Sequence, residues 1–389
     1  MNEGIGSLTS RYINRLSNYG NLPSKPIQTI CKLDNKIDWK KVGANGWSVI
    51  VESIFETIKQ SNTFPLNQFT AKSTFVGGNL PYVSGGLLSD GRVILCPFNS
   101  TTSIIWDPNN DTTVVPGGSY PGNSAFSSCV LLPNGEILFI PRGTACRVYN
   151  PFTNTIRTIG SAPATLNSYV TGVLMQDGRV YCIPNSSASA LIIDPINNTT
   201  KYASGSYTNT GLLGYGGALL PDGRIFVATS TSNTPAWIYD PVKDNLINTS
   251  MSFPYGAQGC LLLPDETIFL SPINGNTYPM IYDWKKDTLR LGKPLLVDGA
   301  SGGSTLLTDG TILLHPIGGP SITVYNPYSD TAKTVPGTIS SSSFTNGIML
   351  FDGRYIMFPR NGTSLVGYGI KQLSFSKEVL LSAHYNLRR

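Results

Sequence analysis

Hydrophobic and polar positions alternate along most of the chain in short runs that turn residues interrupt. Two such runs flank an Asp-Gly pair in TGVLMQDGRVYCIP (171–184) and again in GGALLPDGRIFVA (216–228). Short alternating runs predict half-buried β-strands, and Asp-Gly or Asn-Gly between two of them predicts a hairpin, because both residues tolerate the positive φ angles of a tight turn. The pattern therefore predicts β-hairpins.

This hairpin recurs with a nearly constant period. The seven turns are centred on Asp90, Asn134, Asp177, Asp222, Asp265, Asp309 and Asp352, and successive centres lie 44, 43, 45, 43, 44 and 43 residues apart. A Gly follows six of these residues, and Glu266 follows Asp265. A fixed period of this length is the signature of a repeat architecture.

A second turn follows 16 to 18 residues later in the first six repeats, as in YNPFTNT (149–155) and YDPVKDN (239–245). Pro presets φ, and the preceding Asp or Asn can cap the turn through its side chain. Two hairpins supply four strands, which is the content of one propeller blade. We therefore predict an all-β fold, a seven-bladed β-propeller of four-stranded blades with a small helical N-terminal segment.

The pairing of an Asp-Gly-Arg hairpin with a later Tyr-Asp-Pro hairpin resembles the Kelch and galactose-oxidase-like propeller repeats, over roughly residues 80 to 376. Propellers of this kind also occur in phage and large-virus structural proteins. The resemblance implies the architecture. Kelch repeats carry Gly-Gly after the second strand, where this chain has Pro or Ala228, so we transfer no binding or catalytic residue from the family.

The seventh repeat lacks the Asp-Pro turn and reads NGTSLVGYGIKQLSF (361–375). Two ways of closing the ring are open at this point. Either residues 371–376 complete the seventh blade, or a segment around residues 73–76 supplies its outer strand. We place the propeller at residues 71–389 and a separate helical arm at residues 1–70.

Within this arm, residues 45–59 place apolar side chains along one helical stripe, with Glu and Lys elsewhere. The stripe consists of Trp47, Ile50, Val51, Ile54, Phe55 and Ile58. Such an amphipathic helix either packs on the propeller as a brace or docks the propeller onto other proteins of an assembly. Its apolar face needs a partner in both cases.

Composition excludes several classes of function. Charged residues make up 13% of the chain, the net charge is +5, and the basic residues are scattered, so we expect no nucleic-acid partner. The start of the chain lacks the apolar core of a signal peptide, and no apolar run is long enough to span a bilayer, so we expect no membrane insertion. The expected location is a virion if the protein is viral, and otherwise the cytoplasm.

The sequence contains few residues that could form a catalytic site. Of 23 acidic residues, ten occupy the repeated turn positions, where capping already explains them. His384 lies near the C-terminus, and His315 occupies a strand position that apolar residues fill in other repeats. Six cysteines show no metal-like spacing. We therefore expect no catalytic residues, no metal and no cofactor.

In a propeller both turns of a blade lie at one end of the ring, here called the turn face. The opposite end, the loop face, receives the remaining loops, which are uncharged and rich in Ser, Thr, Asn, Gly and Tyr. Surfaces that combine Tyr with small polar residues are well suited to binding a ligand or another protein. The candidate binding residues there are Tyr120, Arg142, Tyr169, Tyr255, Tyr278 and Arg360.

Three functions fit this picture. The first is a non-catalytic structural or binding propeller in a larger assembly, most simply a virion component of the tail, vertex or capsid surface that recognises a surface glycan or a protein receptor. The second is an intracellular Kelch-like interaction adaptor. The third is a glycan-acting enzyme, which would need two carboxylates, or a His and a carboxylate, to meet on the loop face.

Overall fold

The computed structural model describes residues 69–74, 82–161, 167–207, 213–273, 277–295, 301–307, 310–316, 322–335, 344–350, 355–359 and 364–368. Within these ranges every element is a β-strand. The same ranges contain no helix with the length and hydropathy that a membrane crossing requires. The expected docking helix lies outside the described residues.

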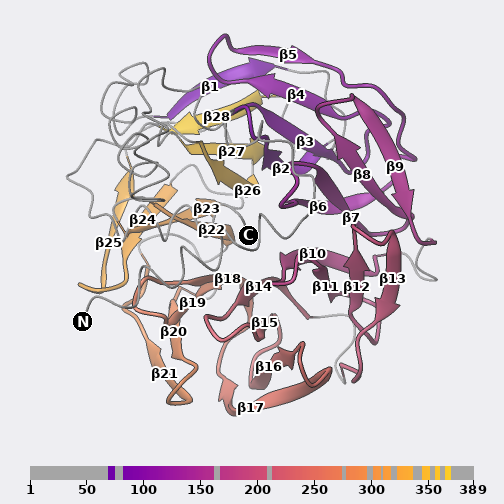
Figure 1. Ribbon diagram of the computed structural model, residues 1–389. Helices are drawn as coiled ribbons and strands as arrows, with labels where there is room; N and C mark the ends of the chain where they lie inside the picture. Colours follow the sequence, from indigo (N-terminus) through magenta and orange to yellow (C-terminus); the bar gives the residue numbers. More distant parts are fainter. Residues whose placement is uncertain are drawn as a thin grey trace, which may run out of the picture.

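The strands form four-stranded antiparallel sheets that are arranged as the blades of a propeller around a central axis (Figure 1). The innermost strands are β2 (Tyr82–Leu87), β6 (Phe126–Leu131), β10 (Tyr169–Leu174), β14 (Leu213–Leu219), β18 (Ala257–Leu262), β22 (Ser301–Leu306) and β26 (Phe344–Met349). The second strands are β3 (Val93–Pro97), β7 (Ile137–Pro141), β11 (Val180–Pro184), β15 (Ile225–Thr229), β19 (Ile268–Pro272), β23 (Ile312–Pro316) and β27 (Tyr355–Pro359).

The outer half of each blade consists of its third and fourth strands, which form the second hairpin in six of the sheets. Its third strands are β4 (Ile104–Asp107), β8 (Cys146–Asn150), β12 (Leu191–Asp194), β16 (Thr234–Asp240), β20 (Met280–Asp283), β24 (Ile322–Asn326) and β28 (Ser364–Tyr368). Its fourth strands are β5 (Thr112–Val114), β9 (Thr155–Ile159), β13 (Thr199–Tyr202), β17 (Asn245–Phe253), β21 (Thr288–Leu291) and β25 (Thr331–Val335). The prediction of a propeller with four-stranded antiparallel blades is thus confirmed.

Six sheets consist of four consecutive strands, and the remaining sheet combines β26, β27 and β28 with β1 (Phe69–Thr74). β1 pairs antiparallel with β28, so that Phe69 lies opposite Tyr368 and Thr74 lies opposite Ser364. The outer strand of the last sheet therefore comes from the beginning of the ring, which decides between the two closures in favour of the N-terminal one. β1 also begins two residues before the expected boundary at residue 71.

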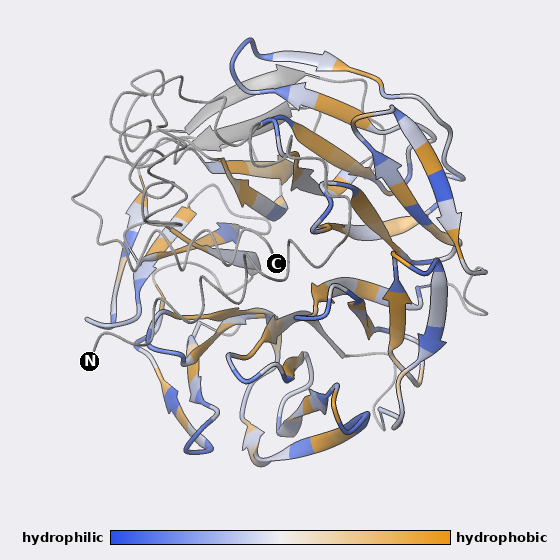
Figure 2. Cartoon of the chain, viewed as in Figure 1, coloured by the Kyte–Doolittle hydropathy of each residue, from blue (hydrophilic) through white to orange (hydrophobic). Residues whose placement is uncertain are grey.

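The hydrophobic core is divided into clusters that lie between neighbouring blades. One cluster fills each junction, including the junction of the last sheet with the first blade, where Ile356 and Phe358 meet Val93 and Leu95. In Figure 2 the second strands carry much of the hydrophobic colour, and hydrophilic colour gathers at the outer hairpins. Burial of apolar area between sheets stabilises the ring.

One contact near the axis recurs between blades. The last residue before the Pro that ends a second strand packs on the innermost strand of the next blade. Where this residue is large, its partner is glycine, because a β-carbon there would lie within 2.2–2.5 Å of the larger side chain. The pairs are Ile140 with Gly172, Ile183 with Gly217, and Phe358 with Gly85. Where both residues are small they touch directly, as Ser271 Oγ and Ser304 Oγ do at 2.5 Å.

The inner hairpins end in a three-residue loop. The Gly91 N–H donates to Leu88 O at 3.0 Å, and the Leu88 N–H donates to Arg92 O at 2.8 Å. In this loop Gly91 has a φ of 89°, whereas Asp90 is not left-handed. The Asp-Gly pair therefore forms a type I turn followed by a left-handed Gly, so that only the Gly of the pair adopts the positive φ that the sequence suggested for both residues. Glu266 adopts the same left-handed conformation, with a φ of 65°.

Candidate functional site

The charged side chains of the turn face cap its own hairpins. In the inner hairpin, Asp90 Oδ1 accepts the backbone N–H of Arg92 at 3.1 Å, and its Oδ2 accepts the guanidinium Nε–H at 2.8 Å. Two further Asp-Gly-Arg turns repeat this arrangement, at Asp177 with Arg179 and at Asp222 with Arg224. The guanidinium of each Arg and the carboxylate of its Asp thus satisfy each other's hydrogen-bonding groups at the surface.

In the outer hairpin the Asp or Asn before Pro accepts backbone N–H groups, as Asp240 does from Val242 at 2.9 Å. The end of the same turn carries another acidic or amide residue in the left-handed conformation, such as Asp244 with a φ of 47°. The hydroxyl of Tyr239 donates to Asp244 Oδ1 at 2.6 Å. Equivalent pairs are Trp106 with Asp111, Tyr149 with Asn154, Tyr282 with Asp287, and Tyr325 with Asp330.

These left-handed residues also join blades. Asp244 accepts the N–H of Ser204, in the preceding blade, at 3.1 Å and forms an ion pair with Lys201 at 3.3 Å. The Tyr239 hydroxyl, followed by Ser204 and Lys201, holds the pKa of the Asp244 carboxyl down to about 2. Asp244 is therefore ionised at neutral pH.

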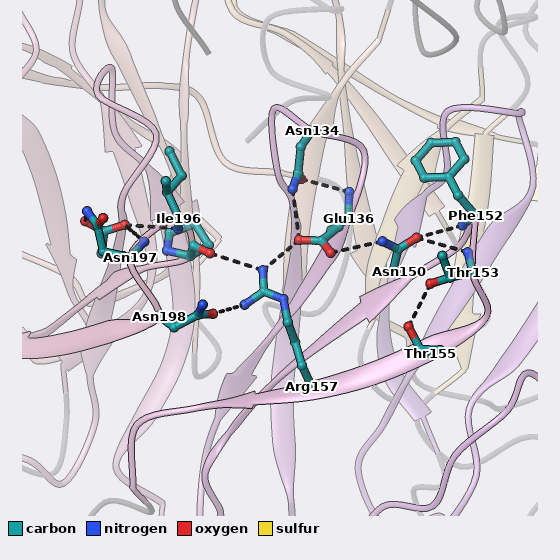
Figure 3. Close-up of polar contacts among 12 residues, drawn as sticks. Asn134, Glu136, Asn150, Phe152, Thr153, Thr155, Arg157, Ile196, Asn197 and Asn198 are labelled. Atoms are coloured by element: carbon teal, nitrogen blue, oxygen red, sulfur yellow. Dashed lines mark hydrogen bonds and ion pairs between the residues drawn. The ribbon is translucent and has the colours of Figure 1, made fainter. Parts of the chain in front are cut away.

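A buried carboxylate forms the centre of a polar network on the turn face (Figure 3). Glu136 Oε2 accepts Arg157 Nη2–H at 2.7 Å and Asn134 Nδ2–H at 2.9 Å, and its Oε1 accepts Asn150 Nδ2–H at 3.2 Å. The Glu136 residue is 7% exposed. A buried charge is tolerated only when it is paired and hydrogen-bonded, and this one is.

Arg157 extends this network into the next blade. Its guanidinium donates to the carbonyl oxygen of Pro195 at 3.1 Å and to the side-chain oxygen of Asn198 (Figure 3). Arg290 makes the corresponding contact with the carbonyl oxygen of Pro327 in its neighbour, at 2.7 Å. The basic residues of the fourth strands thus strap one blade to the next.

Every Asp and Glu in the described part of the chain lies in one of these turn-face hairpins. Hydrogen bonds within the turns and between neighbouring blades account for these carboxylates. They include four to which the sequence analysis gave no role, namely Asp111, Asp244, Asp287 and Asp330. Among the described residues no cluster of His, Cys, Asp or Glu has the composition of a metal site. The described cysteines are free thiols, and burial raises the pKa of Cys129 and of Cys146 to about 12.

The loop face brings two of the predicted binding residues together. Tyr255 follows β17 and Tyr278 precedes β20, and their rings stack nearly parallel, with centroids 5.9 Å apart and an interplanar angle of 8°. Tyr278 is 38% exposed, and Tyr255 is half-buried against the cluster between β16 and β20. These two residues form an aromatic platform, defined as Tyr255 and Tyr278.

Arg142 lies elsewhere on the loop face. Its guanidinium sits 5.0 Å from the centre of the Phe98 ring, and its Nε–H donates to Asn167 Oδ1 at 2.6 Å. The backbone of Arg142 bonds to Ala125 O and receives the N–H of Ser168. A half-buried cation is thereby held where three blades meet.

The other predicted binding residues do not join this surface. Tyr120 is 3% exposed and packs edge-on against Phe126 and Phe139. Tyr169 is 1% exposed in the cluster between β8 and β11. Both tyrosines are core residues and are not available to a ligand at the surface. Arg360 lies outside the described residues.

His315 is buried, 1% exposed, as its strand position predicts. Its Nε2 hydrogen-bonds with the hydroxyl of Tyr355, and the Thr305 hydroxyl lies 2.9 Å from the same Tyr355 oxygen. Burial lowers the pKa of His315 to about 3, so the ring is neutral at pH 7.

The fold is shared with several solved structures. Virginiamycin B lyase from Staphylococcus aureus matches with a TM-score of 0.65 and 10% identity, over 77% of this chain and 98% of that chain. A catalytically inactive variant of that lyase with quinupristin gives a TM-score of 0.65 and 11% identity, over 77% and 98% of the two chains.

The extracellular domain of a putative hybrid two-component system from B. thetaiotaomicron gives a TM-score of 0.58 and 8% identity, over 77% of this chain and 41% of that chain. No protein-family model matches the chain, and neither does a curated protein. At these sequence identities the structural similarity shows only that the chain has the β-propeller fold. The expected resemblance to Kelch repeats is therefore supported as far as the propeller architecture and no further.

Proposed function

We propose that this chain is a non-catalytic binding propeller of a larger assembly, anchored at its turn face and presenting its loop face to a ligand. Within that class we favour a virion component. The observation that carries the proposal is the pairing of Phe69 with Tyr368. Tyr368 occupies the turn-face end of β28, because the third strands of the other blades end there at the second turn of each repeat.

Phe69, where β1 begins, and Tyr368, where β28 ends, therefore lie together on the turn face. Residues 45–59, the predicted amphipathic helix, precede β1 in the sequence, so we propose that they act from this face. The aromatic platform lies on the opposite face, at the junction of the blades that contain β16 and β20. An anchor at one end and a recognition surface at the other give the propeller a defined orientation in its assembly.

Charge distribution supports a binding role. The described carboxylates are all engaged in turn-face hairpins, and the described loop-face residues include Arg142 but no Asp or Glu. General acid–base hydrolysis of a glycan requires carboxylates that meet at the substrate. The loop face instead offers stacked tyrosines and small polar residues, which suit recognition.

Incorporation into purified particles tests the proposal. The full chain and a variant that lacks residues 1–68 would be expressed during infection and quantified in particles by mass spectrometry. We expect the full chain in the particles, and the variant folded but left in the soluble fraction. Tyr278→Ala is the matched control, because it changes only the loop face and should be incorporated normally. Absence of the full chain from particles, or equal incorporation of the variant without residues 1–68, would refute the proposal.

A further inference from the structure

The aromatic platform is the exposed apolar feature of the loop face. Among the described residues, the other exposed large apolar side chains belong to or adjoin outer hairpins, for example Phe152, Val242 and Tyr328. Tyr278 instead lies in the loop between β19 and β20 and is 38% exposed, with the Tyr255 ring parallel to it. The platform thus offers an aromatic surface to solvent with a second ring behind it.

The platform is held rigidly from below. Tyr255 packs against the hydrophobic cluster between its two blades. The next residue, Gly256, approaches the backbone of the neighbouring blade so closely that an added β-carbon would lie 1.9 Å from Ser230 O. Pro279 follows Tyr278 directly and restricts its backbone. A ligand that stacks here does not have to order the rings first, which lowers the entropic cost of binding.

The two segments that carry the rings contain no charged side chain. No Lys, Arg, Asp or Glu occurs between residues 245 and 264 or between residues 267 and 282, the segments that carry the two rings. An exposed cation lies next to them, because Lys293 stands between Gly292 and Leu295, whose N–H groups donate to Pro279 O and Thr277 O. The rings themselves favour a ligand that has both an apolar face and hydrogen-bonding groups.

Polar groups for such a ligand occur on the same segments as the rings. A β-bulge between Ala257 and Gly259 leaves Gln258 outside the regular pairing of β18 with β19, and bulges of this kind often re-aim a side chain next to a binding site. Each Tyr also carries a hydroxyl. A pyranose ring matches this set, because its polarised C–H face packs on the negative face of an aromatic ring while its hydroxyls bond to amides and phenols.

We propose that Tyr278, backed by Tyr255, is a stacking site for a pyranose unit of a surface glycan. This inference rests on the proposed function and names the ligand class of the same face. A proline-rich peptide is the other occupant that aromatic residues commonly bind. Such peptides dock in grooves lined by several aromatic side chains. Two parallel, stacked rings instead present one flat aromatic surface, on which a single sugar ring can pack.

The full chain would be screened on an array of neutral and sialylated oligosaccharides, and the strongest ligand would then be measured by isothermal titration calorimetry. Loss of one stacking contact should weaken binding by about tenfold in Tyr278→Ala. Tyr278→Phe should retain most of the affinity, because the ring remains. Tyr328→Ala is the matched control, since Tyr328 is equally large, 55% exposed and located on the turn face.

Three outcomes would overturn the inference: no glycan binds, Tyr278→Ala binds as well as the unmodified chain, or a proline-rich peptide takes the site and is lost in Tyr278→Ala. The two proposals fail separately. A chain that enters particles but binds no glycan refutes only the ligand class. A chain that binds the glycan but is absent from particles refutes only the assembly role.

Discussion

Phe358 occupies the space beside Gly85 that a β-carbon would need, since an ideal β-carbon on Gly85 would lie 2.4 Å from Phe358 Cζ. Phe358 belongs to β27 of the last sheet and Gly85 to β2 of the first blade. Together with the pairing of β1 and β28, this contact closes the ring through both packing and hydrogen bonding.

The Phe358–Gly85 contact predicts a coupled pair of substitutions. Phe358→Ala should lower the free energy of unfolding by about 3–5 kcal/mol through the cavity it leaves. Gly85→Ala should cost about 1–3 kcal/mol through overpacking. The double variant should lose clearly less than the sum, because the new methyl group enters the vacated space. Denaturant titration of the four proteins measures this coupling, and additivity within about 0.5 kcal/mol would show that the pair is not coupled.

The closure by β1 predicts a sharp boundary for N-terminal truncation. A chain that starts at Phe69 retains β1 and should melt like the full propeller. A chain that starts at residue 75 loses the ladder with β28 and should be destabilised on the order of 3–5 kcal/mol, since several backbone hydrogen bonds are lost. Thermal melting followed by circular dichroism distinguishes the two. Equal melting temperatures would mean that β1 does not contribute to closure.

Arg157 should contribute more to the free energy of unfolding than its partial exposure suggests. Arg157→Ala removes the hydrogen bonds that join Glu136 to Pro195 and Asn198 of the next blade, and leaves the buried carboxylate without its cation. We expect a loss of about 2–3 kcal/mol in the free energy of unfolding. Arg147→Ala is the control, because Arg147 is on the neighbouring strand and donates to Thr158 within the same blade. Its loss should be below about 1 kcal/mol.

His315 predicts a pH dependence of stability. The folded pKa is about 3, below the ordinary value of 6.5, so the unfolded chain binds more protons between these values and stability falls as pH falls. From pH 7 to pH 5 this should cost about 2 kcal/mol. His315→Gln removes the titrating ring, so its free energy of unfolding should change less over the same interval. Parallel curves for the two proteins would contradict the assignment.

The repeat period made the strands and blades predictable, because turns with Asp or Asn before Gly or Pro connect the two strands of nearly every hairpin. Closure stayed open because residues 69–74 contain no turn motif and pair with β28 across the whole length of the ring. The left-handed Asp and Asn residues could have been found, since Asp244 and its equivalents follow the Asp-Pro turn at a fixed offset. We had counted only the residue before Pro.

The candidate site was harder to predict, because a loop residue can face outward or fold back into a blade junction. Tyr120 and Tyr278 both lie in loops of similar composition, yet Tyr120 is 3% exposed and Tyr278 is 38% exposed. The difference arises because Tyr120 meets Phe126 and Phe139 in a junction between blades. Burial of this kind depends on contacts between sheets and not on the local sequence.

The matching of large and small residues across blade junctions limits how this ring can change in evolution. A blade that is duplicated or transposed would bring its own second-strand and innermost-strand residues to new neighbours. A side chain the size of Phe358 needs a glycine beside it and would collide with Cys129 or Cys260, which stand at the position of Gly85 in other blades. Blade number and blade order can therefore change only together with compensating substitutions on both sides of the insertion.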